Sequence, residues 1–433
     1  MATKLVDDAS GNVSSKTESK SDSNDIICKL SLKSQNYAWG KPAKTSKVAQ
    51  LLNATNDINK NYAELWMGTH KNGPSSVILN NDNTQLLSEY INGDLPYLYK
   101  VLSINTALSI QAHPTKKYAE ILHKERPNVY KDPNHKPEMA LALTPFEAMC
   151  GFRPYDEILF YLNGIPEFKS VIKDETYKKF NKACKDKDAK SIEAMLKQVF
   201  TEVMTADKTD ITKALTKLLE RISKPDGDSI PQYKGNIDAK DDSNESNESN
   251  DINVNELVIR LNKTYPCDVG IFGVFILNCF KLNKGEGIFL EANLPHAYLS
   301  GDCLETMACS DNVVRAGLTP KLRDTKVLCN MLQYKSSKPS IMYGKKIGKY
   351  TKRYAPNVKE FALERTIMKD ECNESIDIKS EYPSIILIYE GNGCINNINV
   401  KAGDCLLIPK KCTKLNISCN KNNTFEVARC YTP

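Results

Sequence analysis

The spacing of apolar residues over 156–224 is the feature that most constrains the fold. Residues of this kind recur there at helical intervals, with lysines and glutamates between them, at Ile192, Met195, Leu196, Val199, Val203, Ile211, Leu215, Leu218 and Ile222. On both sides of this segment, short apolar runs alternate with Gly, Pro and Asn, which is typical of β-rich domains. We therefore expect a mainly β protein with an inserted helical domain. A chain of 433 residues is too long for one core, so two or three domains are expected.

Two segments lack the composition of a packed core. Residues 1–25 are rich in Ser, Lys and Asp and contain no apolar run, which predicts a disordered tail rather than a secretory signal. Residues 225–253 include an acidic, low-complexity stretch and read as a solvated linker. The longest apolar run, residues 269–280, is too short to span a bilayer, so we expect no membrane partner.

Overall composition excludes several classes of protein. The 59 basic and 53 acidic residues leave a net charge of +6 without a long basic block, which argues against nucleic-acid binding and is compatible with an anionic substrate. Fourteen cysteines are scattered without a Cys-x-x-Cys pair, so neither a thiolate zinc site nor a disulfide framework is indicated. Reduced thiols of this kind favour a cytoplasmic location.

A metal site is indicated by polar residues in short apolar or Pro-bounded runs. Gln111 and His113 stand two apart, so on a strand their side chains share a face. Glu138 and His296 can complete a set of four ligands. A glutamine oxygen, two imidazoles and one carboxylate suit zinc, and such a mixed set is more often catalytic than structural. We expect one zinc ion per chain, although a Gln-x-His pair alone fits an interior, hydrogen-bonded histidine equally well.

Six motifs occur in a characteristic order along the chain. They are Gln35–Gly40, Ala63–His70, Lys100–Ser103, Leu108–Pro114, Asp132–Met139 and Asp311–Lys321. Together they resemble the motifs of the type I phosphomannose isomerase family over residues 30–330. The resemblance implies a zinc-dependent isomerase that interconverts mannose 6-phosphate and fructose 6-phosphate through an enediol and feeds the formation of GDP-mannose. It also implies two cupin (jelly-roll) barrels with an inserted α-helical domain, and we expect a monomer.

Moving a proton between carbons 1 and 2 of a sugar requires a base. Glu305 is the first candidate, since a carboxylate near a metal and shielded from water can abstract a proton made acidic by a polarised carbonyl. Lys136, close to Glu138 in sequence, is the competitor, provided that burial and nearby cations lower its pKa. The sequence leaves both candidates open.

Further residues are candidates for contact with the substrate. The resemblance implies that Arg315 is an active-site residue, and its guanidinium suits bidentate contact with a phosphate or an oxyanion. It likewise implies that Ser109, as a hydroxyl donor to phosphate, and Lys100 bind substrate. The other substrate-binding candidates are Lys321, Trp39, Tyr298, Asp311 and His135.

A weak internal repeat completes the expected domain organisation. Residues 284–292 and 401–409 each read as a turn with Gly and an acidic residue that enters an apolar strand, as in cupin half-motifs. The first copy leads into His296, whereas the second leads to no ligand. The expected units are the tail 1–25, the catalytic cupin domain in two parts at 26–155 and 254–334, the helical insertion 156–224, the acidic linker 225–253 and a cupin-like domain without metal at 335–433.

Two alternative functions are kept beside the isomerase. Another metal-dependent cupin enzyme, such as an iron dioxygenase, would more usually use His-x-His ligands and would not need the cations Arg315 and Lys321. A catalytically silent cupin that binds sugar phosphates would be expected to lack a ligand, Arg315 or Glu305. Because all of these residues are present, we favour the isomerase.

Overall fold

The computed structural model describes residues 26–79, 83–224, 229–233 and 252–433. The expected tail at 1–25 and most of the expected linker at 225–253 lie outside these ranges. Within them, no helix combines the length and the apolar character that a membrane crossing requires.

The largest sheet contains the histidine motifs and has eleven strands. Its main path runs β16-β13-β10-β14-β8-β5-β2; β11 joins β14 to β12, and β9 joins β14 to β15. Its strands are β2 (Lys33–Gln35), β5 (Glu64–Met67), β8 (Tyr97–Ile104), β9 (Ile110–Ala112), β10 (Glu138–Ala142), β11 (Phe146–Phe152), β12 (Leu277–Leu282), β13 (Gly287–Leu290), β14 (His296–Ala308), β15 (Val314–Gly317) and β16 (Ile341–Met342).

Strand β14 belongs to two parts of this sheet. Its first half pairs with β11 and, at His296, with β9, whereas its second half lies between β10 and β8. The change occurs at Gly301, where φ is +110° and a Cβ atom would lie 2.6 Å from the carbonyl oxygen of Pro145, so only glycine fits. A buried core that includes Leu102, Phe146 and Tyr298 lies between the two parts.

The remaining strands form a nine-stranded sheet, a four-stranded sheet and a small hairpin. The nine-stranded sheet contains β1 (Cys28–Ser31), β6 (Ser76–Ile78), β7 (Thr84–Leu86), β17 (Lys345–Lys346), β18 (Thr351–Tyr354), β19 (Ala362–Lys369), β21 (Ser384–Glu390), β24 (Cys405–Ile408) and β26 (Thr424–Tyr431). The other two contain β20 (Cys372–Asp377), β22 (Asn392–Ile395), β23 (Ile398–Lys401) and β25 (Lys414–Cys419), and β3 (Lys41–Pro42) with β4 (Asn61–Tyr62).

The sheets exchange strands across the expected domain boundaries. Strand β1 pairs with β24, so the N-terminal segment contributes β1, β6 and β7 to the C-terminal sheet. In the other direction, β16 pairs with β13 of the sheet that contains the histidines. A boundary at residue 335 therefore does not separate the sheets, because free strand edges pair by proximity rather than by sequence order.

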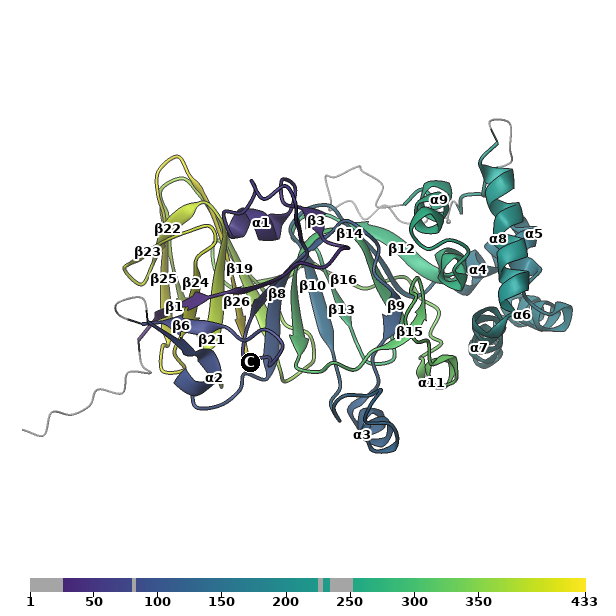
Figure 1. The fold of residues 1–433 in the computed structure, drawn as a ribbon, viewed down its shortest axis with the longest axis horizontal. Helices are drawn as coiled ribbons and strands as arrows, with labels where there is room; N and C mark the ends of the chain where they lie inside the picture. Colours follow the sequence, from purple (N-terminus) through teal and green to yellow (C-terminus); the bar gives the residue numbers. More distant parts are fainter. Residues whose placement is uncertain (1–25, 80–82, 225–228, 234–251) are drawn as a thin grey trace, which may run out of the picture.

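Helices gather at one end of the molecule, far from β22 and β23 (Figure 1). That group comprises α4 (Tyr155–Gly164), α5 (Pro166–Lys169), α6 (Asp174–Asp186), α7 (Ala189–Thr205), α8 (Lys208–Ile222) and α9 (Val254–Thr264). The others are α1 (Lys47–Leu51), α2 (Leu87–Tyr90), α3 (Lys116–Glu125), the 3₁₀ helix η3 (Val269–Phe272), α10 (Gly273–Ile276) and α11 (Thr325–Met331).

The apolar periodicity accounts for the packing of the helices. In α7, Leu196, Val199 and Val203 are fully buried, and in α8 Leu215 and Leu218 are too. The protein is therefore mostly strands with a helical domain, as the sequence predicted. The described sheets run as open paths with edge strands, so closure into two barrels stays a prediction.

Candidate metal centre

Three side chains from separate strands meet in the interior of the eleven-stranded sheet. His113 follows β9, Glu138 begins β10 and His296 begins β14. Each side chain is at most 2% exposed, and Oε2 of Glu138 lies 3.4 Å from Nε2 of His113 and 3.3 Å from Nε2 of His296. Two ligands of a tetrahedral zinc ion at about 2.0 to 2.1 Å are themselves about 3.3 Å apart, so this spacing fits zinc.

The other ring nitrogen of each histidine is held by the backbone. Nδ1 of His113 lies 2.7 Å from the carbonyl oxygen of Asn312, and Nδ1 of His296 lies 2.9 Å from that of Leu294. A carbonyl oxygen only accepts, so Nδ1 of each histidine donates and Nε2 keeps a lone pair that can bind a metal. Such a carbonyl partner is the usual support of a metal-binding histidine.

The three facing atoms lack any hydrogen-bond partner among the described residues. They are Nε2 of His113, Oε2 of Glu138 and Nε2 of His296. A buried polar atom without a partner costs about 1 to 3 kcal/mol, so three such atoms within 4.8 Å of one another fit a group of cation ligands. Their donor set of two imidazoles and one carboxylate suits zinc and leaves a position for further ligands.

Ionisation states in the cluster also suit a cation. Burial lowers the pKa of His113 to about 4, so its imidazole is neutral at physiological pH. Burial alone would raise the pKa of Glu138, but the Lys136 ammonium at 2.9 Å holds the pKa of this carboxyl well below its usual range. Glu138 is therefore an anion, bound by Lys136 through Oε1 and free to bind a metal through Oε2.

Gln111 and Arg315 lie beside this cluster on neighbouring strands. In the backbone register Gln111 of β9 stands opposite His296 on one side and opposite Arg315 of β15 on the other. Arg315 is about half-buried, burial lowers the pKa of its guanidinium, and no ion pair joins it to a carboxylate within the described parts of the chain. An unpaired, partly desolvated guanidinium is available to an anionic ligand.

A second ionic cluster lies behind the first, on β5, β8 and β14. Nζ of Lys100 lies 3.1 Å from Oε2 of Glu305 and 3.5 Å from Oε2 of Glu64. Burial opposes the charge of Lys100, but these two carboxylates more than offset it and raise the pKa of its ammonium. Burial raises the pKa of Glu305, and Lys100 limits that rise. A carboxyl whose pKa is raised is a stronger base than an ordinary carboxylate.

Tyr298 also lies between these groups. Its phenol is buried, and its hydroxyl has no hydrogen-bond partner in the described ranges. Burial raises the pKa of Tyr298 well above its ordinary value, with Glu305 and Glu138 adding to the effect. The hydroxyl is therefore a neutral group able to donate to a ligand.

The other predicted substrate-binding residues are more dispersed. Trp39 stacks on Tyr37 with ring centroids 5.8 Å apart, and Asp311 pairs with His70 at 3.3 Å. Ser109 is half-buried immediately before β9, and Lys321 is exposed beyond β15.

His135 has a partner that its sequence context did not suggest. Its Nε2 lies 2.5 Å from Oε1 of Glu360, which belongs to the C-terminal segment. The structure therefore joins this residue to the C-terminal part of the chain through its ring nitrogen.

Sequence reasoning also missed two residues of the second cluster. Glu64 and Trp66 were not among the candidate site residues, although the Lys100 ammonium lies 5.1 Å from the centroid of the Trp66 ring. Both belong to the motif Ala63–His70. The usable signal was their spacing of two, which puts them on one face of β5.

Known proteins resemble this chain over most of its length. The model of the phosphomannose isomerase type I catalytic domain matches residues 27–155, and the model of the helical insertion domain of the same family matches residues 171–277. The mannose-6-phosphate isomerase of Homo sapiens is 40% identical over 388 residues, which cover 84% of this chain and 87% of the relative. Mannose-6-phosphate isomerase 2 of Arabidopsis thaliana is 37% identical and covers 87% of both chains.

Solved structures agree in fold. A zinc-bound mannose 6-phosphate isomerase superposes with a TM-score of 0.75 at 28% identity, covering 94% of this chain and 99% of the other. A single-residue mutant of phosphomannose isomerase from Salmonella typhimurium superposes with the same TM-score at 29% identity and the same coverage.

Proposed function

The chain belongs to the type I phosphomannose isomerase family, and we propose that it interconverts mannose 6-phosphate and fructose 6-phosphate at the centre formed by His113, Glu138 and His296. The observation that carries the proposal is the set of three buried, unpartnered ligand atoms that point at one another. The choice of mannose 6-phosphate as substrate rests on relatives named as mannose-6-phosphate isomerases, which match most of this chain.

We infer that His113, Glu138 and His296, with Gln111 as the fourth ligand, hold zinc. When bound, the ion supplies a Lewis acid that stabilises negative charge on the oxygens of carbons 1 and 2. Lys136 neutralises part of the charge on Glu138 through the contact at 2.9 Å and so helps to fix the orientation of this ligand.

The proton transfer between carbons 2 and 1 needs one base beside the metal centre. We assign the base to Glu305, which removes the proton from carbon 2 of the open-chain aldose and returns it to carbon 1 of the enediol. Its raised pKa suits both steps, because the same carboxyl must accept and then donate. Lys136 is the alternative base. Its Nζ contacts the anionic Glu138 at 2.9 Å, and such a contact stabilises the protonated ammonium, which cannot act as a base. Burial shifts the pKa of Glu305 in the direction that a base needs.

Substrate binding is assigned to the residues around this proton path. Arg315 is suited to the phosphate or to the developing oxyanion, since it is half-buried without an anionic partner in the described ranges. Tyr298 can donate its free hydroxyl to a sugar oxygen. Ser109, Lys321, Trp39 and Asp311 are proposed for the remaining contacts, and Lys100 is proposed to act through its pairing with Glu305.

We also propose a barrel architecture, a cellular location and a monomeric state for this protein. We infer two cupin barrels, because separate buried cores lie on both sides of the nine-stranded sheet and within the two parts of the eleven-stranded one. All fourteen cysteines are free thiols, which favours the cytoplasm. The monomeric state remains a prediction, and light scattering after size exclusion tests it.

Exchange of the carbon-2 proton with solvent tests the assignment of the base. The Glu305→Gln variant keeps the shape of the side chain but cannot accept the proton, so it should bind substrate while exchange falls by about 100-fold or more. The Lys136→Met variant should retain exchange. The reverse pattern would transfer the role to Lys136, and a wild-type protein inactive on mannose 6-phosphate would instead favour a silent sugar-phosphate-binding cupin.

A further inference from the structure

The backbone after Arg315 is held in an unusual conformation. The pairing of β15 with β9 shifts register between Arg315 and Gly317, which is a β-bulge that re-aims the chain. Leu318 then adopts a left-handed conformation with φ of +53°, although it is a fully buried, non-glycine residue. Such a conformation costs about 1 kcal/mol or more and persists only where the surroundings impose it.

One carboxylate imposes this turn. Oδ1 of Asp268 accepts hydrogen bonds from the amides of Leu318 and Gly270, both at 2.7 Å. Oδ2 accepts a longer one, of 3.3 Å, from the amide of Thr319. Asp268 thus caps the helix η3 through Gly270 and at the same time binds two consecutive amides of the turn.

The two backbones can approach this closely because both contact positions are glycines. A Cβ atom on Gly317 would lie 2.5 Å from Cα of Gly270, and one on Gly270 would lie 2.5 Å from the amide nitrogen of Leu318. Contacts this short exclude any side chain at either position. Glycine at both positions therefore allows the backbones to approach closely enough for Asp268 to bind the turn.

The turn connects two residues of the proposed site. Arg315 lies immediately before it, and Lys321 lies after it with its amide donating to Oγ1 of Thr319 at 3.1 Å. Neither side chain forms an ion pair within the part of the chain that the structure describes. Their positions are therefore set by the backbone that bears them rather than by salt bridges.

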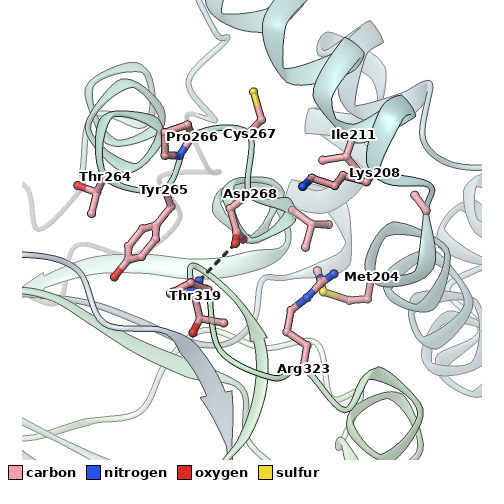
Figure 2. A pocket seen from close by; sticks show the side chains of 13 residues that line it. Met204, Lys208, Ile211, Thr264, Tyr265, Pro266, Cys267, Asp268, Thr319 and Arg323 are labelled. Carbon is pink, nitrogen blue, oxygen red and sulfur yellow. Dashed lines mark hydrogen bonds between the residues drawn. The ribbon is translucent and has the colours of Figure 1, made fainter.

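Figure 2 shows Asp268 on the wall of a cavity between this turn and the helical domain, with a dashed line to Thr319. The cavity has a volume of about 480 Å³, and Met204, Lys208 and Arg323 are among its lining residues. Beside this cavity, the hydrogen bonds of Asp268 connect the turn to η3.

We propose that Asp268 is a positioning residue for the isomerase reaction, which fixes Arg315 and Lys321 by binding the turn between them. The inference rests on the proposed function for its kinetic consequence. Asp268 itself does not touch the substrate, and its effect passes through the backbone of Leu318 and Thr319.

The Asp268→Ser variant separates capping from this positioning role. Serine is as good an N-cap as aspartate and can still accept from Gly270, but it is too short to bind the turn as well. We expect kcat/KM to fall by about tenfold or more. The constant that changes, kcat or KM, should be the one that Arg315→Ala changes. In a background that lacks both positioned side chains, Arg315→Ala with Lys321→Ala, the same substitution should change kcat/KM by less than about twofold, because Asp268 acts only through these two residues.

A matched control is Asp207→Ala. Asp207 caps α8 through the amide of Thr209 at 2.7 Å and forms no hydrogen bond with the turn after Arg315 in the described structure, so kcat and KM should stay within about twofold of the wild type. Bound zinc should be unchanged in both variants. If Asp268→Ser folds poorly, Asp268→Asn tests the Oδ2 contact alone. It keeps an oxygen for the amides of Gly270 and Leu318 but loses the acceptor of the Thr319 amide, so kcat/KM should fall in the same direction by a smaller factor.

Hydrogen exchange gives a readout that does not depend on turnover. The amides of Leu318 and Thr319 should exchange faster in Asp268→Ser than in the wild type, and Asp207→Ala should leave them unchanged. Unaltered exchange together with wild-type kinetics in both Asp268 variants would overturn the proposal, as would equal kinetic losses with and without the side chains of Arg315 and Lys321. An inactive wild-type enzyme would count against the proposed function only, since the exchange result would still decide the role of Asp268.

Discussion

Replacing Lys100 with methionine tests the acid–base role of Glu305 through the charge beside it. The Lys100 ammonium is buried between Glu305 at 3.1 Å and Glu64 at 3.5 Å. Methionine has a similar length and no charge, so the variant leaves two buried carboxylates without their cation. The pKa of Glu305, which burial already raises, should then rise further, because Lys100 is the group that limits the rise.

The distances give the size of the effect. At an effective dielectric constant of about 20, unit charges 3.1 Å apart, the separation in this pair, attract each other by about 5 kcal/mol. Glu64 shares the same ammonium, so part of this attraction acts on Glu305. A base must be deprotonated to act, and the acidic limb of the kcat/KM profile should therefore move to higher pH in Lys100→Met.

The assay is a pH profile of mannose 6-phosphate turnover, combined with urea unfolding. Loss of one partner from a buried ionic cluster should lower the free energy of unfolding by about 3 to 5 kcal/mol. Lys41→Met is the matched control, since Lys41 pairs with the buried Asp302 at 2.5 Å and should lower stability without moving the limb. A Lys100→Met enzyme with full turnover and a limb within about 0.3 unit of the wild type would refute the assignment of Glu305 as the base.

Three further predictions address the metal, the guanidinium and the acidic segment. His296→Ala should lose both bound metal and activity while keeping its circular dichroism spectrum, because the sheet cores do not depend on the ion; retained zinc, measured by mass spectrometry, would contradict this. Arg315→Ala should cut kcat about 100-fold with a smaller change in KM if the guanidinium stabilises charge that develops in the transition state, whereas a rise in KM alone would limit it to ground-state binding. Deleting residues 241–250 should leave turnover within about twofold of the wild type, since their composition cannot bury enough apolar surface to offset ordering; a large loss would show that the segment contributes to the site.

The sequence predicted those features that follow from short-range patterns. The helical spacing from Ile192 to Leu218 predicted α7 and α8. The predicted apolar residues in this range are buried except Met195, which is half-buried. The candidate ligands were identifiable because His113, Glu138 and His296 lie in distinctive motifs of a chain with only five histidines. Their convergence is now visible as a cluster within 4.8 Å.

Features that depend on strand pairing could not be predicted. Glu64, Lys100 and Glu305 lie on three strands, and only the pairing of β8 with both β5 and β14 brings them together. The contacts of His135 with Glu360 and of Asp268 with the turn after Arg315 likewise join distant segments. Local spacing contains no information on such contacts, because loop closure between distant segments depends on the whole topology.

The most direct test of the account is the dependence of isomerase activity on zinc. Protein stripped with a chelator should lose turnover of mannose 6-phosphate, and stepwise addition of zinc should restore activity in proportion to occupancy, with a break at about one ion per chain. His296→Ala should not recover under the same titration. Full turnover by protein that contains no stoichiometric divalent metal would contradict the site formed by His113, Glu138 and His296.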